Sequence, residues 1–187
     1  MASGELLRRH ASGWGERAAR TAAGAPARPR QHTVVVTCMD ARIDPVLLFG
    51  IEPGDAHVLR NAGGIVTDDV VRSVAVSQRK LGTSEVLLVQ HTDCGMATFT
   101  DESFTAELTA AAGRRPAWRP GTFRDPAVSV ADGVRRLRAD PFLRPGTVVR
   151  GFVVDVRTCA LHEVPAAPPE PAARTARRPL RRRPRRA

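Results

Sequence analysis

Two cysteines and one histidine stand where they could hold a metal ion. Cys38 follows the apolar, β-branched run Val34–Thr37, and His91 ends a second apolar run. Cys94 follows His91 at the i+3 position. Two thiolates and an imidazole suit zinc better than magnesium or calcium, and three protein ligands leave a fourth position open for chemistry. These residue types therefore predict one Zn²⁺ per chain.

Other interpretations of these residues stay open at this point. A zinc ion here could be purely structural, with Asp40 as its fourth ligand, because no further Cys or His lies nearby in the sequence. Alternatively, Cys38 or Cys94 could be a nucleophile activated by His91. The cysteine-phosphatase loop does not fit, because it needs an arginine at the sixth position and neither cysteine has one.

The elements that must position these residues alternate along the chain. Short apolar runs predict strands at 32–37, 56–60, 85–90, 147–156 and 160–164. Capping residues and apolar periodicity predict helices at 44–49, 67–82, 102–112 and 127–139, with a further helix beginning within 95–99. In the helix at 127–139, Val128, Val134 and Leu137 are expected to point inward. This alternation predicts an α/β fold with a mostly parallel central β-sheet flanked by helices, and ligands bind at the carboxyl ends of such strands.

Three motifs in the same order resemble those of the β-class carbonic anhydrases, including their small bacterial branch. These motifs are CMDAR at 38–42, RNAGG at 60–64 and HTDCGM at 91–96, within a similarity that runs from about residue 32 to 164. The resemblance implies reversible hydration of carbon dioxide to bicarbonate and a proton by zinc-bound hydroxide, in a homodimer or higher homo-oligomer. Some relatives with the same ligands hydrolyse carbon disulfide or carbonyl sulfide, which is one alternative.

Residue by residue, the resemblance makes Cys38, His91 and Cys94 the zinc ligands, with Asp40 and Arg42 as a catalytic pair beside the metal. Asp40 would accept a hydrogen bond from the hydroxide, and Arg42 would hold this carboxylate with two parallel bonds. Without Arg42, Asp40 could become a fourth ligand and close the site. Two thiolate ligands would keep the pKa of the metal-bound water above about 7, the value typical of a site with neutral ligands, which favours alkaline activity.

Further expectations concern the surroundings of the metal. The residues expected to line its pocket, the first three from the resemblance and the others as an apolar wall, are Asn61, Gly63, Gly64, Ile43, Val66 and Met96. Asp93 lies between two ligands and is expected to accept a hydrogen bond from one of them. Cys159 is expected to be an ordinary buried thiol, although it stands where this family more often has a glycine turn.

Composition divides the chain into three parts. We predict an N-terminal arm at 1–31, partly helical or disordered, a zinc-dependent carbonic anhydrase domain at 32–164, and a disordered Arg/Pro-rich tail at 165–187. The tail holds eight arginines and one glutamate, so it supplies +7 of the net charge of +10. The second alternative is a non-catalytic zinc-binding protein whose basic tail binds polyanions. We favour a tail without function and expect no nucleic-acid partner, because no aromatic side chain interleaves the arginines for base stacking.

The sequence also indicates where the protein works. No apolar run approaches the roughly 20 residues that cross a bilayer, and the N-terminal residues lack the apolar core of a signal peptide. Three cysteines in 187 residues do not suggest a disulfide scaffold. We therefore expect a cytoplasmic protein whose partners are carbon dioxide, bicarbonate and further copies of its own chain.

Overall fold

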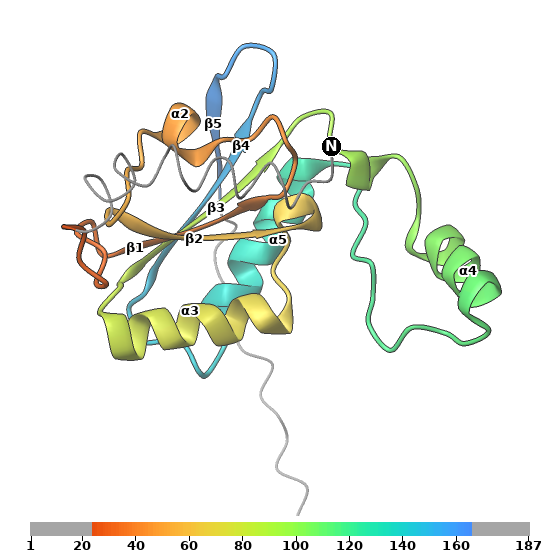
Figure 1. Cartoon of the computed structure of the whole chain (residues 1–187), viewed down its shortest axis with the longest axis horizontal. Coiled ribbons are helices and arrows are strands. Elements are labelled where there is room, and N and C mark those ends of the chain that lie inside the picture. Colours follow the sequence, from red (N-terminus) through yellow and green to blue (C-terminus); the bar gives the residue numbers. More distant parts are fainter. Residues whose placement is uncertain (1–23, 166–187) are drawn as a thin grey trace, which may run out of the picture.

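The computed structural model describes residues 24–165, which form an α/β fold around one five-stranded sheet (Figure 1). In spatial order the strands are β2 (Ala56–Asn61), β1 (Thr33–Cys38), β3 (Glu85–His91), β4 (Val148–Val154) and β5 (Leu161–Val164). The first four run parallel, and β5 runs antiparallel to β4. The predicted mostly parallel sheet is confirmed, with strand ends that differ from the predicted ones by one or two residues.

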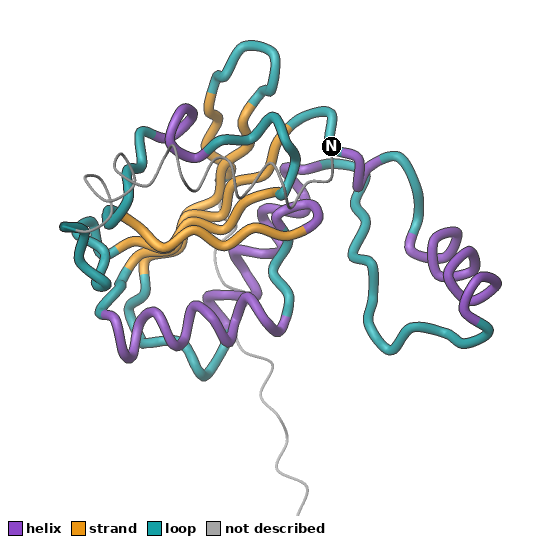
Figure 2. Tube along the Cα trace, viewed as in Figure 1, coloured by secondary structure: helices purple, strands orange, loops and turns teal. Residues whose placement is uncertain are grey.

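Helices cover both faces of the sheet and also extend beyond it (Figure 2). They are α2 (Pro45–Phe49), α3 (Asp68–Leu81), α4 (Asp101–Ala112) and α5 (Pro126–Ala139), with short 3-10 helices η1 (Ala62–Gly64) and η2 (Gly95–Ala97). α3 and α5 pack on one face and α2 packs on the other, whereas α4 stands away from the sheet. The helix expected to begin within 95–99 is the single turn of η2.

The central strand β1 is buried along its whole length, which explains its unbroken apolar sequence. Val34 and Val36 face α3 and α5, whereas Val35 faces the layer of α2. Side chains alternate between the two faces of a strand, so a strand covered on both sides needs apolar residues at every position. This burial fixes the point at which β1 ends, and with it the position of Cys38.

Local hydrogen bonds set the ends of the helices near the site. Asp44 accepts bonds from the backbone amides at the start of α2, and Thr67 accepts one from Val70 at the start of α3. Gly82 ends α3 in the left-handed region at φ 79°, as is common for a glycine after a helix. These caps are the ones that the sequence predicts.

The inward face of α5 differs from the predicted one. Val134 and Leu137 are buried as expected, but Val128 is 58% exposed and Val130 is fully buried instead. Residues 130, 134 and 137 follow the i, i+4, i+7 spacing of one helix face, and residue 128 lies outside this row. The prediction for Val128 is therefore wrong, because it did not respect the phase of the helix.

Cys159 corrects a second expectation. Its thiol is exposed, and its φ of 58° places it in the left-handed region, within the turn between β4 and β5. A glycine would fit this backbone without strain. The expectations for the N-terminal arm before residue 24 and for the tail after residue 165 concern residues that lie outside the described part of the chain. Within residues 24–165, no helix is both long and apolar enough to cross a membrane.

Candidate metal centre

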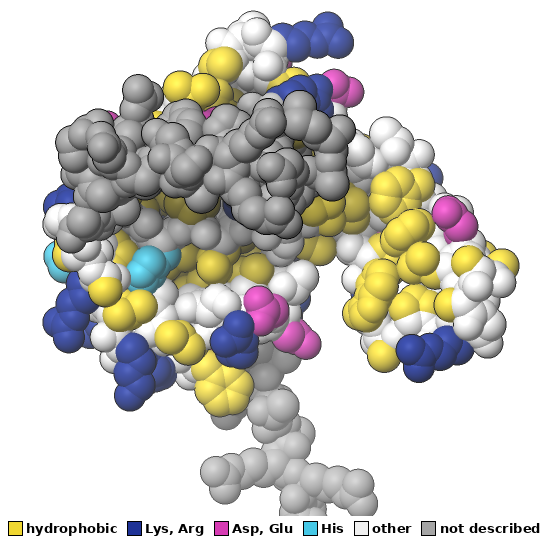
Figure 3. All heavy atoms as spheres, viewed as in Figure 1, with side chains coloured by type: hydrophobic (Ala, Val, Ile, Leu, Met, Phe, Trp, Pro, Cys, Tyr) yellow, Lys and Arg dark blue, Asp and Glu magenta, His cyan; other side chains and the backbone are white. Residues whose placement is uncertain are grey.

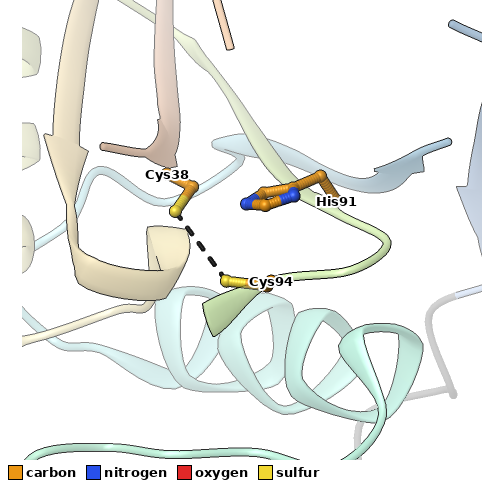
Figure 4. Close-up of side chains that lie close together, drawn as sticks. All are labelled: Cys38, His91 and Cys94. Atoms are coloured by element: carbon orange, nitrogen blue, oxygen red, sulfur yellow. Dashed lines mark hydrogen bonds between the residues drawn. The ribbon is translucent and has the colours of Figure 1, made fainter. Parts of the chain in front are cut away.

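Cys38, His91 and Cys94 converge beyond the carboxyl ends of two neighbouring strands (Figure 4). Cys38 is the last residue of β1 and His91 the last of β3, and these strands pair in parallel. Cys94 follows one short turn later, and the three potential ligand atoms lie within 4.8 Å of one another. All three residues are at most 4% exposed. The structure thus brings together the three residues that the sequence predicts as ligands.

The histidine ring presents its free nitrogen to the cysteine sulfurs. His91 Nδ1 lies 2.8 Å from the Thr92 carbonyl, which can only accept, so Nδ1 donates the proton. His91 Nε2 is buried and has no hydrogen-bond partner among the described residues. A buried polar atom without a partner is costly, and a cation at this point would remove the cost. The ring therefore fits a metal at Nε2.

The sulfur atoms of Cys38 and Cys94 are close enough to form a hydrogen bond. They lie 3.9 Å apart, and this contact lowers the pKa of Cys38 to about 4 and raises that of Cys94. Burial by itself lowers the pKa of His91, but the neighbouring Cys38 sulfur raises it above the usual value. Negative charge is thus already stabilised where a cation would bind. Two sulfurs and one imidazole nitrogen make a donor set that fits Zn²⁺.

Asp40 lies beside this cluster and is held by Arg42. Arg42 Nε and Nη2 donate to the two Asp40 carboxylate oxygens at 3.0 and 2.8 Å, and the Arg42 backbone amide adds a third bond. Asp40 Oδ2 lies 3.8 Å from His91 Nε2. The Arg42 guanidinium holds the pKa of Asp40 well below its usual range, and Asp40 in turn raises the pKa of Arg42. Asp40 is therefore an ionised acceptor that borders the metal position.

Asp93 has a different contact from the expected one. Its carboxylate accepts a bond of 2.8 Å from Arg42 Nη1, and its carbonyl accepts another from Arg42 Nη2. The acceptor for His91 is instead the Thr92 carbonyl. Asp93 can reach Arg42 because its backbone is left-handed, with a φ of 55°. Its role is to hold Arg42, which in turn holds Asp40.

A cleft of about 650 Å³ opens onto Cys38, Asp40 and Cys94. Two of the six residues expected to line the metal pocket, Gly63 and Met96, border it. Ile43 is instead buried in the core on the α2 face, and Val66 is buried in the core on the α3 and α5 face. These two residues do not supply the apolar wall, because packing against the sheet turns both away from the cleft.

The remaining two residues, Asn61 and Gly64, shape the loop after β2 and do not line the cleft. The Asn61 side chain closes this loop through two hydrogen bonds to the Ile65 backbone. At Gly64, with φ of 60°, an added Cβ would lie 2.8 Å from the backbone of Thr37 and Cys38. Glycine is required here because the loop touches the very end of β1.

Sequence reasoning missed two groups of residues at this site. Arg60 donates to the backbone carbonyls of Cys38 and Asp40 at 3.0 and 2.8 Å. Its place in the RNAGG motif was the available signal. Aromatic residues of a distant segment, Phe99, Phe104 and Trp118, also border the cleft. No spacing in the sequence announces them, because only the tertiary fold brings that segment to the metal.

Known proteins resemble this chain in sequence and in fold. Residues 33–115 match the family model described as carbonic anhydrase. The β-carbonic anhydrase 1 of Mycobacterium tuberculosis is 50% identical over 139 residues, which cover 74% of this chain and 85% of that protein. A carbon disulfide hydrolase of Acidianus sp. is 35% identical and covers 69% of this chain and 75% of its own length.

A solved structure agrees with these sequences. The carbonic anhydrase of Streptococcus mutans superposes with a TM-score of 0.81 at 34% identity, over 88% of this chain and 99% of that one. The relatives carry two kinds of name, carbonic anhydrase and carbon disulfide hydrolase, on one scaffold. From the sequence identity, the shared fold and the matching family model, we conclude that the chain belongs to the β-carbonic anhydrase family.

Proposed function

We propose that this protein catalyses the reversible hydration of carbon dioxide to bicarbonate and a proton, with one Zn²⁺ held by Cys38, His91 and Cys94. The observation that carries this proposal is the ionised Asp40, held by Arg42 beside three buried ligand atoms. A purely structural zinc site would not need such a carboxylate next to it. Zinc, when bound, would supply the Lewis acidity that makes hydroxide available from water at mildly alkaline pH.

The residues of the chain have separate tasks in this reaction. Asp40 would accept a hydrogen bond from the nucleophilic oxygen and so orient the lone pair of that oxygen toward the carbon of carbon dioxide. Arg42 keeps Asp40 ionised. It also prevents the Asp40 carboxylate from turning to bind the metal, because two hydrogen bonds fix both carboxylate oxygens. The cleft admits the uncharged substrate, and the proton released by the reaction must leave through the same opening to water.

Stopped-flow measurement of carbon dioxide hydration at about pH 8.5, with zinc-loaded protein and an indicator dye, tests this function. We expect acceleration in the natural protein and its loss in Asp40→Ala, with one zinc per chain in both. If Asp40 were a fourth structural ligand, Asp40→Ala would weaken zinc binding instead. A zinc-loaded protein without any acceleration would contradict the proposal.

Carbon disulfide hydrolysis is the second candidate, since a relative of that name is 35% identical. The ligand set alone does not separate the two substrates, because both are linear, uncharged molecules attacked at carbon. Release of hydrogen sulfide from carbon disulfide, measured beside carbon dioxide hydration on the same preparation, decides between them. The ratio of the two values of kcat/KM names the preferred substrate.

We also propose that the protein is a cytoplasmic homodimer. Support for assembly comes from α4, which has no fully buried residue and stands away from the sheet (Figure 1). A partner subunit would cover part of this exposed helix. Sedimentation velocity of the full chain would show a single species of twice the chain mass, and a monomer at micromolar concentration would contradict this assembly. Fractionation of the source cells tests the location.

A further inference from the structure

One side of the metal cleft is built by a projecting segment of the chain. Residues 98–123, called here the α4 arm, leave the body after η2, form α4 and return through a loop (Figure 1). The arm contributes Phe99, Phe104, Trp118 and Pro120 to the cleft that reaches Cys38 and Cys94. Hydrophobic side chains gather on the arm in the space-filling view (Figure 3). The metal site therefore opens toward an aromatic surface.

This surface has the chemistry to bind an uncharged molecule. Phe99 and Phe104 form a tilted pair with ring centroids 5.2 Å apart, a geometry that aromatic rings favour. Asp40 is the only ionisable side chain other than the two ligand cysteines on the described lining of the cleft, and Arg42 already neutralises its charge. The free energy of an apolar solute falls when it moves from water to this aromatic wall, which consists of Phe99, Phe104, Trp118 and Pro120. An anion has no such gain, because it loses its hydration.

The volume of the cleft indicates that the aromatic wall does more than enclose the reacting molecule. A space of about 650 Å³ lies within the range of pockets that hold drug-sized ligands, and a triatomic substrate fills only a small part of it. The aromatic residues therefore border more space than the reacting molecule needs. Trp118, which borders this space, is 60% exposed to solvent.

Asp101 joins the two parts of the arm that carry the aromatic wall, the helix α4 and the returning loop. At the first position of α4, its carboxylate accepts bonds of 2.7 Å from both Thr122 N and Thr122 Oγ1, and one of 2.5 Å from Arg119 Nε. These bonds join the start of α4 to the returning loop, on either side of Pro120. These bonds thereby keep Phe104, on the helix, and Trp118, on the loop, beside the same cleft.

We infer that the aromatic face of the α4 arm, chiefly Phe104 and Trp118, is a capture surface that binds the neutral, apolar substrate beside the metal, and that Asp101 positions it. This inference rests on the proposed function, because it concerns the route of carbon dioxide or a related linear molecule to that site. The aromatic residues act on binding and not on bond formation. Their loss should therefore raise KM and leave kcat in place.

Steady-state kinetics of the zinc-loaded full chain test the wall. Phe104→Ala and Trp118→Ala should each raise KM for carbon dioxide about three- to tenfold with kcat within about twofold. Phe142→Ala is the matched control, because Phe142 is 70% exposed and does not border the cleft, and it should behave as the natural protein. A fall in kcat at unchanged KM, or an equal effect in the control, would overturn the inference.

Asp101→Asn should raise KM in the same way, because it loses the charge-assisted bond to Arg119 and loosens the loop that carries Trp118. Glu107→Gln, a change of an exposed acid on the same helix, is its control. Sedimentation velocity must accompany these assays. If the higher KM appears only together with dissociation of the oligomer, the wall is an assembly surface and the inference fails.

A binding measurement without turnover separates this inference from the proposed function. The chain has two tryptophans, Trp14 and Trp118. In a Trp14→Phe variant, tryptophan fluorescence therefore comes from Trp118 alone. In a Trp14→Phe/Asp40→Ala protein, carbon disulfide should quench Trp118 emission in a saturable manner, after correction for absorbance, and more weakly when Phe104→Ala is added. Saturable quenching, when the natural protein itself does not accelerate carbon dioxide hydration, would keep the wall and reject the proposed function. Linear quenching, unaffected by Phe104→Ala, would reject the wall.

Discussion

The Arg42 guanidinium binds the Asp40 carboxylate through two parallel hydrogen bonds of 3.0 and 2.8 Å, although only one residue separates them in the chain. Asp93 completes the arrangement by accepting from the remaining side of the guanidinium. Arg42 is thus fixed from both sides, and Asp40 can neither rotate freely nor bind a proton easily. The arrangement leaves one carboxylate oxygen 3.8 Å from His91 Nε2.

Arg42→Ala should therefore allow the Asp40 carboxylate to turn toward the metal and bind it as a fourth ligand. We expect carbon dioxide hydration to fall about a hundredfold or more, the usual range for losing a positioned proton acceptor. Zinc should remain at one per chain. Metal analysis and stopped-flow kinetics check both parts, and the absorption spectrum of the cobalt-substituted protein reports whether a carboxylate joins the metal. Arg72→Ala, which breaks an exposed pair with Asp69, should leave activity unchanged. Full activity in Arg42→Ala would contradict the role of this pair.

Gly64→Ala should disturb the metal site through the backbone. The new Cβ would lie 2.8 Å from Cys38 N and must displace the end of β1. Gly82→Ala is the control, since Gly82 also has a positive φ but has nothing within 4 Å of an added Cβ. The control should cost about 1 kcal/mol for the left-handed backbone alone. Gly64→Ala should cost about 1–3 kcal/mol more and weaken zinc binding. Denaturant unfolding and competition with a zinc chelator measure the two effects, and equal costs in both variants would reject the steric explanation.

Asp101 should make the stability of the protein depend on acid pH. Burial by itself raises its pKa, but the bonds from Thr122 and Arg119 outweigh burial and lower the pKa to about 2. A carboxyl with a lower pKa in the folded state stabilises that state only while it is ionised. Its contribution is therefore complete above about pH 4, the usual pKa of Asp, and is lost as the pH falls through 2. The difference in unfolding free energy between the natural protein and Asp101→Asn should shrink over this range. A difference that stays constant from pH 6 to 2 would contradict the assignment.

The inward face of α5 can be tested with two valines. Val130 is fully buried against the sheet, and Val128 is 58% exposed. Val130→Ala should cost about 1.5–3 kcal/mol of unfolding free energy, whereas Val128→Ala should stay within about 0.5 kcal/mol. Thermal or denaturant unfolding gives both values. A larger loss of stability in Val128→Ala than in Val130→Ala would mean that Val128 faces the core, as the sequence alone suggested.

The sequence predicts the metal centre better than its surroundings, and the reason is physical. Cys38 and His91 end buried parallel strands, and such ends meet at one sheet edge whatever the loops do. The contacts of Asp93 depend on one left-handed residue, which no hydrophobic pattern reveals. Trp118 reaches the cleft through the Asp101–Thr122 bonds, between residues 21 positions apart. Contacts of this kind follow from tertiary packing and have no periodic signal.

The exposed turn at Cys159 provides a direct gauge of metal loading. The chain has three cysteines. Cys38 and Cys94 lie buried together, and Cys159 is open to solvent. With zinc held by the buried pair, a thiol-specific reagent should modify one sulfur per chain under native conditions, and three after denaturation with a chelator. The sulfurs that react under native conditions only after a chelator is added would thus report the occupied fraction of a preparation before any enzyme assay is run.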